Sequence, residues 1–212
     1  MRKDPDLKVV TPTKSTVDTT ETDGRRQRSE RSRKLIIDAM LDLLRDGEVR
    51  PGAARVAEVA GVGLRTVFRL FDDMDSLYRE LMKEAEHEFL PGFMSPLTAE
   101  DWRAQLDQLI SRRATMYERI MPLKVAAGIR RFQSDFLMDS HKRFRSLERS
   151  GLVGVLPTDL AANNTLFAAL ETALCFDAWR AMRQDQELTP EESEAVMLRT
   201  AAALLDHSTS GF

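Results

Sequence analysis

The stretch "AEVAGVGLRTVFRLFDDMDSL", from Ala57 to Leu77, contains two residue patterns. Small and apolar residues recur at helical spacing, and Gly61 and Gly63 interrupt them. Glycine readily adopts the left-handed backbone conformation that ends many helices, so we expect one short helix to end at Gly61 and another to follow it. Two short helices joined by a tight turn are typical of a helix-turn-helix unit.

The second of these helices is predicted to have two different faces. At about 100° per residue, Val67, Leu70 and Phe71 fall on one side. Arg65 and Arg69 fall on the opposite side, where a small helical core does not need them. Such a helix fits the major groove of DNA, in which arginine bonds guanine or a phosphate. The alternative is a helical hairpin inside a bundle, with both arginines in solvent.

A basic segment lies upstream of this unit. Residues 24–34, "GRRQRSERSRK", hold six basic side chains and one acid, although the net charge of the whole chain is −3. A small basic zone on an acidic body suggests one end that faces a polyanion, and the alternative is a solvated charge run. Because the basic segment and the arginine-bearing helix suit the same partner, together they favour binding to double-stranded DNA.

The rest of the chain is predicted to be all-α. Apolar residues recur at helical spacing from about Ser29 onward, and no segment shows a convincing strand pattern. The expected boundaries are a helix end at Gly47, a cap at Asp73 or Asp75, a helix start at Pro122, a long helical segment over residues 158–184 and a last helix over about residues 190–206.

Three regions are expected along the chain. Residues 1–24 are rich in threonine and charge, and they cannot bury enough apolar surface to offset the entropy of ordering, so a disordered tail is predicted. "LPGFMSP", residues 90–96, contains two prolines and is predicted to link two domains. Residues 25–90 then form the first domain with its connecting helix, and residues 97–208 form the second.

The composition argues against several classes of protein. Cys175 is the only cysteine, so no disulfide can form within the chain, which fits the reducing cytoplasm. We find neither a secretory signal nor an apolar run near the roughly 20 residues that span a bilayer. His87, His141 and His207 lie far apart and show no metal-ligand spacing with other residues. With no nucleophile or phosphate-loop motif either, the sequence predicts no enzyme, metal or cofactor.

The stretch "RVAEVAGVGLRTVFRLFDDMDSL" resembles the signature of the tetracycline-repressor (TetR) family of transcriptional regulators. The resemblance covers about residues 29–80, with the helix-turn-helix unit at 52–71. The matching positions, in order, are Val56, Ala57, Ala60, Gly61, Val62, Thr66, Phe68, Phe71 and Leu77.

This resemblance implies an N-terminal three-helix helix-turn-helix domain followed by a helical ligand-binding and dimerisation domain. It implies a homodimeric repressor that a small-molecule effector releases from a pseudo-palindromic operator. The DNA-binding residues that it implies, together with the basic segment, are Gly63, Leu64, Arg65, Thr66, Phe68, Arg69, Arg26, Arg28 and Arg33.

The C-terminal part, "LETALCFDAWRAMRQDQELTPEESEAVMLRTAAALL", is similar to the last two helices of some family members, which form a four-helix interface with a second copy. The candidate interface residues are Leu166, Leu170, Leu174, Met197 and Leu204. The candidate effector-pocket residues, each of which could instead belong to the core alone, are Trp102, Met116, Tyr117, Phe132 and Phe136. Polar groups that could orient a ligand, or lie in solvent, are His141, Arg130 and Arg131.

Three positions depart from the family pattern. Members usually have Ser or Thr at the position of Gly63, Tyr at Phe68 and Lys at Met74, and these polar groups contact the DNA backbone. A protein that contacts fewer phosphates binds DNA less tightly and with a weaker salt dependence, although Arg65 and Arg69 could compensate. The alternative hypothesis is therefore a helical ligand-binding or protein-interaction dimer without strong DNA binding.

Overall fold

The structure, a computed structural model, describes residues 19–209, and the regular elements in that range are all helical, which confirms the all-α prediction. They are, in chain order, α1 (Thr19–Arg45), α2 (Ala53–Val59), α3 (Leu64–Leu70), α4 (Met74–Met94), α5 (Trp102–Arg130), the 3-10 helix η1 (Arg131–Gln133), α6 (Asp135–Val155), α7 (Thr158–Ala162), α8 (Asn164–Ala173), α9 (Phe176–Arg180), the π-helical turn η2 (Ala181–Asp185) and α10 (Pro190–Thr209).

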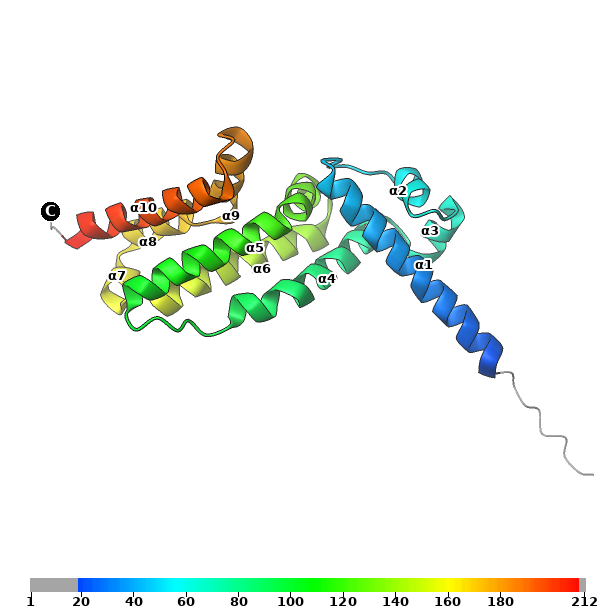
Figure 1. Ribbon diagram of the computed structural model, residues 1–212, viewed down its shortest axis with the longest axis horizontal. Helices are drawn as coiled ribbons and strands as arrows, with labels where there is room; N and C mark the ends of the chain where they lie inside the picture. The colour runs from blue at the N-terminus through cyan, green and yellow to red at the C-terminus, as the bar shows by residue number, and fades with distance from the viewer. Residues whose placement is uncertain (1–18, 210–212) are drawn as a thin grey trace, which may run out of the picture.

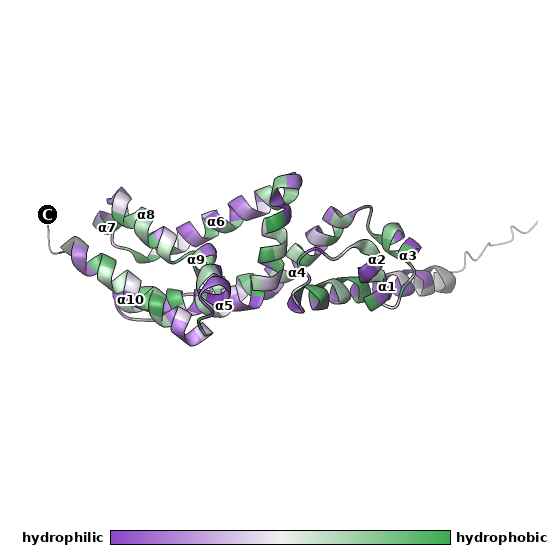
Figure 2. Ribbon diagram, turned by 90° about the horizontal axis from the view of Figure 1, so that it is seen from above, coloured by the Kyte–Doolittle hydropathy of each residue, from purple (hydrophilic) through white to green (hydrophobic). Residues whose placement is uncertain are grey.

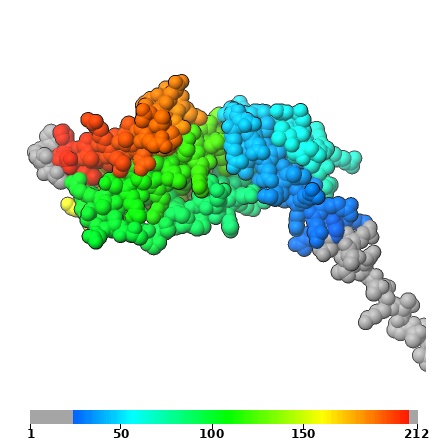
Figure 3. Space-filling view, viewed as in Figure 1, coloured from blue at the N-terminus to red at the C-terminus, as the bar shows by residue number. Residues whose placement is uncertain are grey.

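The molecule is elongated, with α1, α2 and α3 at one end and α8 and α10 at the other (Figure 1). Between them, α4 runs from the first end beside α5 and α6 and packs against both. Hydrophobic and hydrophilic positions alternate along the helices in Figure 2, as expected of helices that bury one face. In Figure 3 the coloured part of α1 that comes first in the chain, drawn in dark blue, extends below α2 and α3.

Two hydrophobic cores meet along α4 and α5. The first joins α1, α2, α3 and the start of α4, and the end of α5 adds Leu123, Ala126 and Ala127 to it. The second joins the end of α4, through Phe93, to α5, α6, α8, α9 and α10. Because α4 and α5 belong to both cores, a shift of either helix would change the packing at both ends of the molecule.

Several local boundary signals are confirmed. Gly47 follows α1 with a φ of +89°, in the left-handed region that glycine favours. A capping box starts α4, in which the Ser76 N–H donates to the Asp73 carboxylate over 2.7 Å. The last helix begins at Pro190, as expected.

The predicted tail and linker need correction. Residues 1–18 of the tail lie outside the described range, but residues 19–24 belong to α1. The linker prediction over 90–96 is wrong for its first part, because α4 continues through Pro91 to Met94. Proline weakens a helix interior, but the following Phe93 is buried in the second core, and this burial favours the continued helix.

Two predictions in the C-terminal half are also wrong. Pro122 lies inside α5 instead of starting a new helix, and it is flanked by the buried residues Ile120 and Leu123. Core packing on both sides therefore keeps α5 continuous. The segment 158–184 is divided among α7, α8, α9 and most of η2, with a break after Leu174 that buried charged groups stabilise, as described below.

Candidate nucleic-acid interface and inner cavity

The turn between α2 and α3 depends on Gly61, whose φ is +64°. The Val62 N–H donates to the Ala57 carbonyl over 3.0 Å, and the Gly61 N–H donates to the Glu58 carbonyl over 3.1 Å. These are the two bonds of a Schellman motif, which requires the left-handed conformation at Gly61. The glycine thus sets the angle at which α3 leaves α2, and the left-handed turn predicted there is confirmed.

The predicted division of α3 into two faces agrees with its burial. Val67 and Phe71 are buried in the first core, and Leu70 is partly buried. On the opposite side Arg65 and Arg69 are exposed. Within the described residues, neither guanidinium forms a hydrogen bond or ion pair. Both cations are therefore available to an external anion.

We use the name α3 surface for the predicted contact residues of the helix and its entry, which are Gly63, Leu64, Arg65, Thr66, Phe68 and Arg69. All are exposed except Thr66, which is partly buried, and 52% of Phe68 is exposed. The Gly63 carbonyl accepts the Thr66 N–H over 2.8 Å, but Gly63 supplies no side-chain cap. An apolar ring and two cations thus share one small surface.

The predicted upstream arginines divide into two groups, and the first is exposed. Arg26 pairs with Glu30 over 3.2 Å, and the Arg28 Nε donates to the Gly24 carbonyl over 3.1 Å, both within α1. Such exposed intrahelical contacts contribute little stability, so either side chain can exchange its partner for a phosphate at small cost.

Arg33 is partly exposed and is bound to the first domain instead. Its guanidinium donates to the Leu70 carbonyl over 3.1 Å, lies 3.6 Å from the Glu80 carboxylate and stacks 4.6 Å from the centre of the Phe71 ring. Arg33 thereby fastens α1 to the end of α3 and to α4. A direct DNA contact would require the cation to exchange these partners, and the contact predicted for Arg33 stays a prediction.

An inner cavity of about 270 Å³ lies between α4, α5 and α6. Its lining is mostly apolar and consists of Met82, Ala85, Glu86, Phe89, Leu90, Phe93, Met116, Ile120, Leu123, Lys124, Ser140, Arg143, Phe144 and Leu147. Bundle interiors of this kind are common binding sites for small molecules. Because six of these residues belong to α4, an occupant would touch the helix that the two cores share.

Only one of the five predicted pocket residues, Met116, lines this cavity. Tyr117 is fully buried in the second core, and Trp102 packs at its edge. Phe132 is 74% exposed, and Phe136 packs against the first core. Aromatic content alone could not separate these environments, because they depend on how α4, α5 and α6 come together.

A second depression, of about 390 Å³, shares Lys124 with the inner cavity. His141 and Arg131 line it, as does Asp177. Burial and the neighbouring Arg131 lower the pKa of His141. Arg130, the other polar candidate, instead pairs with Asp75 over 2.9 Å and so joins the end of α5 to the start of α4.

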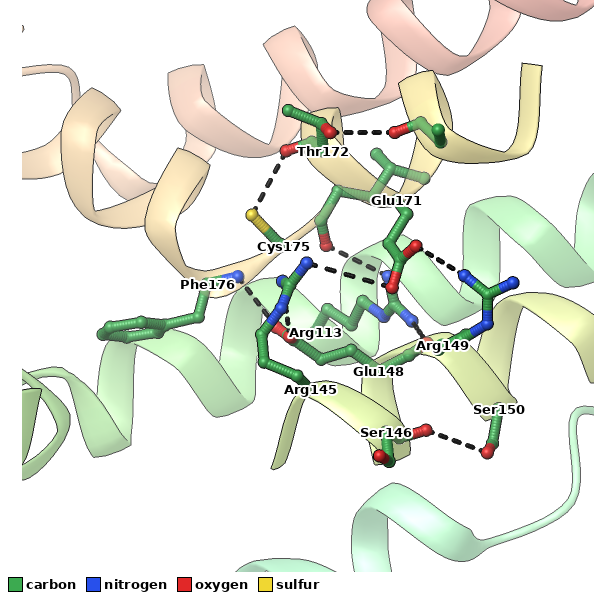
Figure 4. Close-up of polar contacts among 12 residues, drawn as sticks. Arg113, Arg145, Ser146, Glu148, Arg149, Ser150, Glu171, Thr172, Cys175 and Phe176 are labelled. Atoms are coloured by element: carbon green, nitrogen blue, oxygen red, sulfur yellow. Dashed lines mark hydrogen bonds and ion pairs between the residues drawn. The ribbon is translucent and has the colours of Figure 1, made fainter. Parts of the chain in front are cut away.

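A buried charged network, which the sequence analysis missed, lies deeper in the second core (Figure 4). Arg113 is 0% exposed and Glu148 is 1% exposed. The Glu148 carboxylate accepts the Tyr117 hydroxyl over 2.6 Å, the Phe176 N–H over 2.8 Å and the Arg145 guanidinium over 2.8 Å. Burial raises the pKa of Tyr117 well above its ordinary value, so its hydroxyl remains a donor.

This network explains why the chain breaks between α8 and α9. The break frees the Leu174 carbonyl and the Phe176 N–H inside the core, where unpaired backbone groups are costly. Arg113 donates to that carbonyl over 3.0 Å and also to the Glu148 carbonyl, while Glu148 accepts the N–H. One feature of the sequence could have revealed this network. Arg113 lies four positions after Leu109, so a charged residue stands on the apolar stripe of α5.

Most of the predicted dimer residues are buried within the chain itself. Leu166, Leu170, Leu174 and Met197 belong to the second core, and Leu204 is partly buried beside it. These four buried side chains cannot reach a second copy, so the prediction is corrected for them. The exposed residues of the same two helices include a set of small or β-branched side chains, Thr165, Ala168, Thr172, Ala195, Val196, Ala202 and Ala203, beside the polar and charged Asn164, Glu191, Glu192, Arg199, Asp206 and His207.

Two further features of the described residues bear on the possible partners. No helix among them combines the length and the apolar character that crossing a bilayer requires. Across the same residues, no three His, Cys, Asp or Glu side chains are grouped to hold a metal ion.

Comparison with known proteins gives a likeness in structure. No protein-family model matches the chain, and no curated protein matches its sequence. A crystal structure of a transcriptional regulator from Rhodococcus sp. Rha1 is similar, with a TM-score of 0.61 and 19% sequence identity over 84% of this chain and 96% of that one. At this identity the likeness shows a shared fold over most of this chain and nearly all of the other.

Proposed function

We propose that the chain is a DNA-binding transcriptional regulator of the TetR type. The observation that carries this proposal is the α3 surface, on which Arg65 and Arg69 are exposed without partners among the described residues while the other face of the helix is buried. Arginines on a short helix after a tight turn suit the edges of guanine and the phosphates of a major groove. The similar structure from Rhodococcus, itself a transcriptional regulator, supports the same role.

The proposal includes a homodimer. Two copies related by a two-fold axis would place their α3 helices in successive major grooves of a pseudo-palindromic operator. The exposed small residues of α8 and α10 support an interface there, because small side chains let helices approach closely. That end of the molecule lies opposite the α3 surface in Figure 1 and leaves α3 free for DNA.

Repression relieved by a small molecule is the regulatory part of the proposal. α4 is tied to α5 near both of its ends, through the Asp75–Arg130 pair and through Arg112, which donates to the carbonyls of Phe93 and Ser95. A ligand in the inner cavity would contact α4 between these ties. If it binds better to one position of α4, it shifts the population toward that position and changes the spacing of the two α3 helices.

Selection from random duplex DNA tests this function. The full-length protein is incubated with a random-sequence pool, the bound fraction is sequenced, and the enriched duplex is measured by gel shift alongside DNA from upstream of the protein's own gene. We expect an inverted repeat to be enriched and to lose affinity when Arg65 or Arg69 becomes alanine. If no sequence is enriched, the alternative of a helical ligand-binding or protein-interaction dimer is favoured, in line with the absence of a side-chain cap at Gly63.

A further inference from the structure

Lys124 is unusual among the residues of the inner cavity. Its side chain is partly buried, and its ammonium lies 3.9 Å from the centre of the Phe144 ring and 5.7 Å from that of Phe176. Among the described residues, no carboxylate forms an ion pair with it. Burial lowers the pKa of Lys124 to about 8, so the fold is destabilised by holding a cation here.

The two acids whose charges act on Lys124 leave it unpaired. Glu148 is already engaged by Tyr117 and Arg145, and Asp177 is exposed in the second depression. The rings of Phe144 and Phe176 offset only part of the missing hydration, since a cation–π contact contributes about 2 kcal/mol at a desolvated site. An internal ion pair therefore does not account for the presence of Lys124 in the cavity wall.

The rest of the cavity surrounds the ammonium with apolar groups. Beside Lys124, its charged residues are Glu86 and Arg143, which are exposed and of opposite sign. Ser140 is buried and lines the same small hollow as Lys124. The cavity thus combines one partly buried ammonium with a mostly apolar lining, and its other two charged residues lie at exposed positions.

We propose that this cavity binds a small monocarboxylic acid with an apolar body, whose carboxylate pairs with Lys124 and whose body lies against α4, α5 and α6. A single ammonium neutralises one negative charge, and the lining is mostly apolar, so a monoanion with an apolar body matches it better than a small dianion such as phosphate. Since a small group such as a water molecule takes about 30 Å³ in a liquid, about 270 Å³ holds on the order of ten non-hydrogen atoms. An eight-carbon fatty acid has this size and charge.

The binding of such an acid does not depend on the proposed function, and only its role as an effector rests on that proposal. If the protein is a regulator, such an acid is the class of its effector, because it would touch Met82, Phe89 and Phe93 on α4. Binding itself requires no DNA. Ligand binding and operator binding can therefore fail separately.

Calorimetry and thermal unfolding of the full-length protein with octanoate and with 1-octanol test the site. We expect octanoate to bind at least tenfold more tightly than octanol at pH 7 and to raise the Tm, because a ligand of the native state stabilises it. Lys124→Met should lower the octanoate affinity at least tenfold and leave octanol binding unchanged. The control is Lys142→Met, which removes an exposed lysine of the neighbouring helix and should change neither affinity.

A second variant checks the location. Leu147→Trp fills the cavity from α6 and should abolish the binding of both probes. The proposal is overturned if octanol binds as well as octanoate, if neither probe binds, if Lys124→Met keeps the preference, or if Leu147→Trp binds both as before. A protein that selects an operator but binds no octanoate would overturn only this inference. One that binds octanoate but selects no DNA would overturn only the proposed function.

Discussion

Arginines in the two halves of the molecule are held in opposite ways. Arg65 and Arg69 on α3 are exposed and have no partner among the described residues, whereas Arg113 on α5 is fully buried and bonded to backbone carbonyls. Arg145 likewise pairs with the buried Glu148. The difference separates two uses of one residue type, since a cation with internal partners supports the fold and a cation without them is available for binding.

The largest effect is expected from breaking the buried network. Glu148→Ala removes the carboxylate that accepts the Phe176 N–H and pairs with Arg145, and it leaves buried polar groups without partners. We expect the free energy of unfolding to fall by about 3–5 kcal/mol, measured by urea denaturation. The control is Glu88→Ala, whose exposed carboxylate lies 4.0 Å from Arg119 and should cost less than about 1 kcal/mol. Equal losses in the two variants would contradict the assigned role of Glu148.

Substitutions on the α3 surface are expected to lower the affinity for DNA and to leave the stability of the fold nearly unchanged. Arg65→Ala and Arg69→Ala should each weaken operator binding by about 1–3 kcal/mol. Since neither guanidinium has a partner in the described part of the chain, the free energy of unfolding should change by no more than about 0.5 kcal/mol. Gel shifts and urea denaturation on the same preparations compare the two quantities, with the exposed Lys142→Ala as control. A loss of stability that matches the loss of affinity would show that these arginines serve the fold.

At Lys124 we expect a smaller change in the free energy of unfolding, and a gain instead of a loss. Its folded-state pKa of about 8 lies below the unfolded value of about 10.4, so between these two pH values the unfolded chain binds a proton that the folded chain lacks. Wild-type stability should therefore rise with pH over this window. Lys124→Met removes the buried cation, and we expect it to be more stable by about 1–2 kcal/mol at pH 7, with the gain shrinking toward pH 10.

Urea denaturation of the wild type and of Lys124→Met at pH 7 and at pH 10 measures the gain in stability at each pH. Titrating groups that the two proteins share cancel in this comparison. The charged groups near Lys124, from α4, η1, α6 and α9, are Glu86, Arg131, His141, Arg143, Arg145, Glu148, Asp177 and Arg180. The pKa of His141 is lowered, so its titration lies below this pH window. A gain that is the same at both pH values would show that Lys124 stays charged throughout.

The sequence predicted features that depend on neighbouring residues and missed those that depend on distant ones. Gly61 and Asp73 act through the backbone within a few positions, and both behave as predicted. Pro91 and Pro122 carry equally local signals, but core packing of residues beside them overrides those signals. Fold class and the two faces of α3 were therefore predictable from periodicity alone.

The cavity was less predictable than the α3 surface, for the same physical reason. Periodicity places Met116 and Tyr117 on inward faces, but only the packing of three helices decides that Met116 lines the cavity and that Tyr117 bonds Glu148. Lys124 carried no signal as a buried residue, because a lysine on a helix is usually exposed. Its position became informative only once Phe144 and Phe176 were placed around it.

Arg33 is intermediate between the two uses of arginine and gives the smallest expected effect. Its partly exposed guanidinium bonds the Leu70 carbonyl and lies near Glu80, so Arg33→Ala should cost about 1 kcal/mol of unfolding free energy. Because its contacts are internal, the slope of log affinity for the operator against log salt should not change. Arg28→Ala, the matched control on the exposed side of α1, should reduce that slope by about one if Arg28 contacts a phosphate. If Arg33→Ala also reduces the slope by about one, Arg33 exchanges its internal partners for a phosphate when DNA binds, as the sequence predicted.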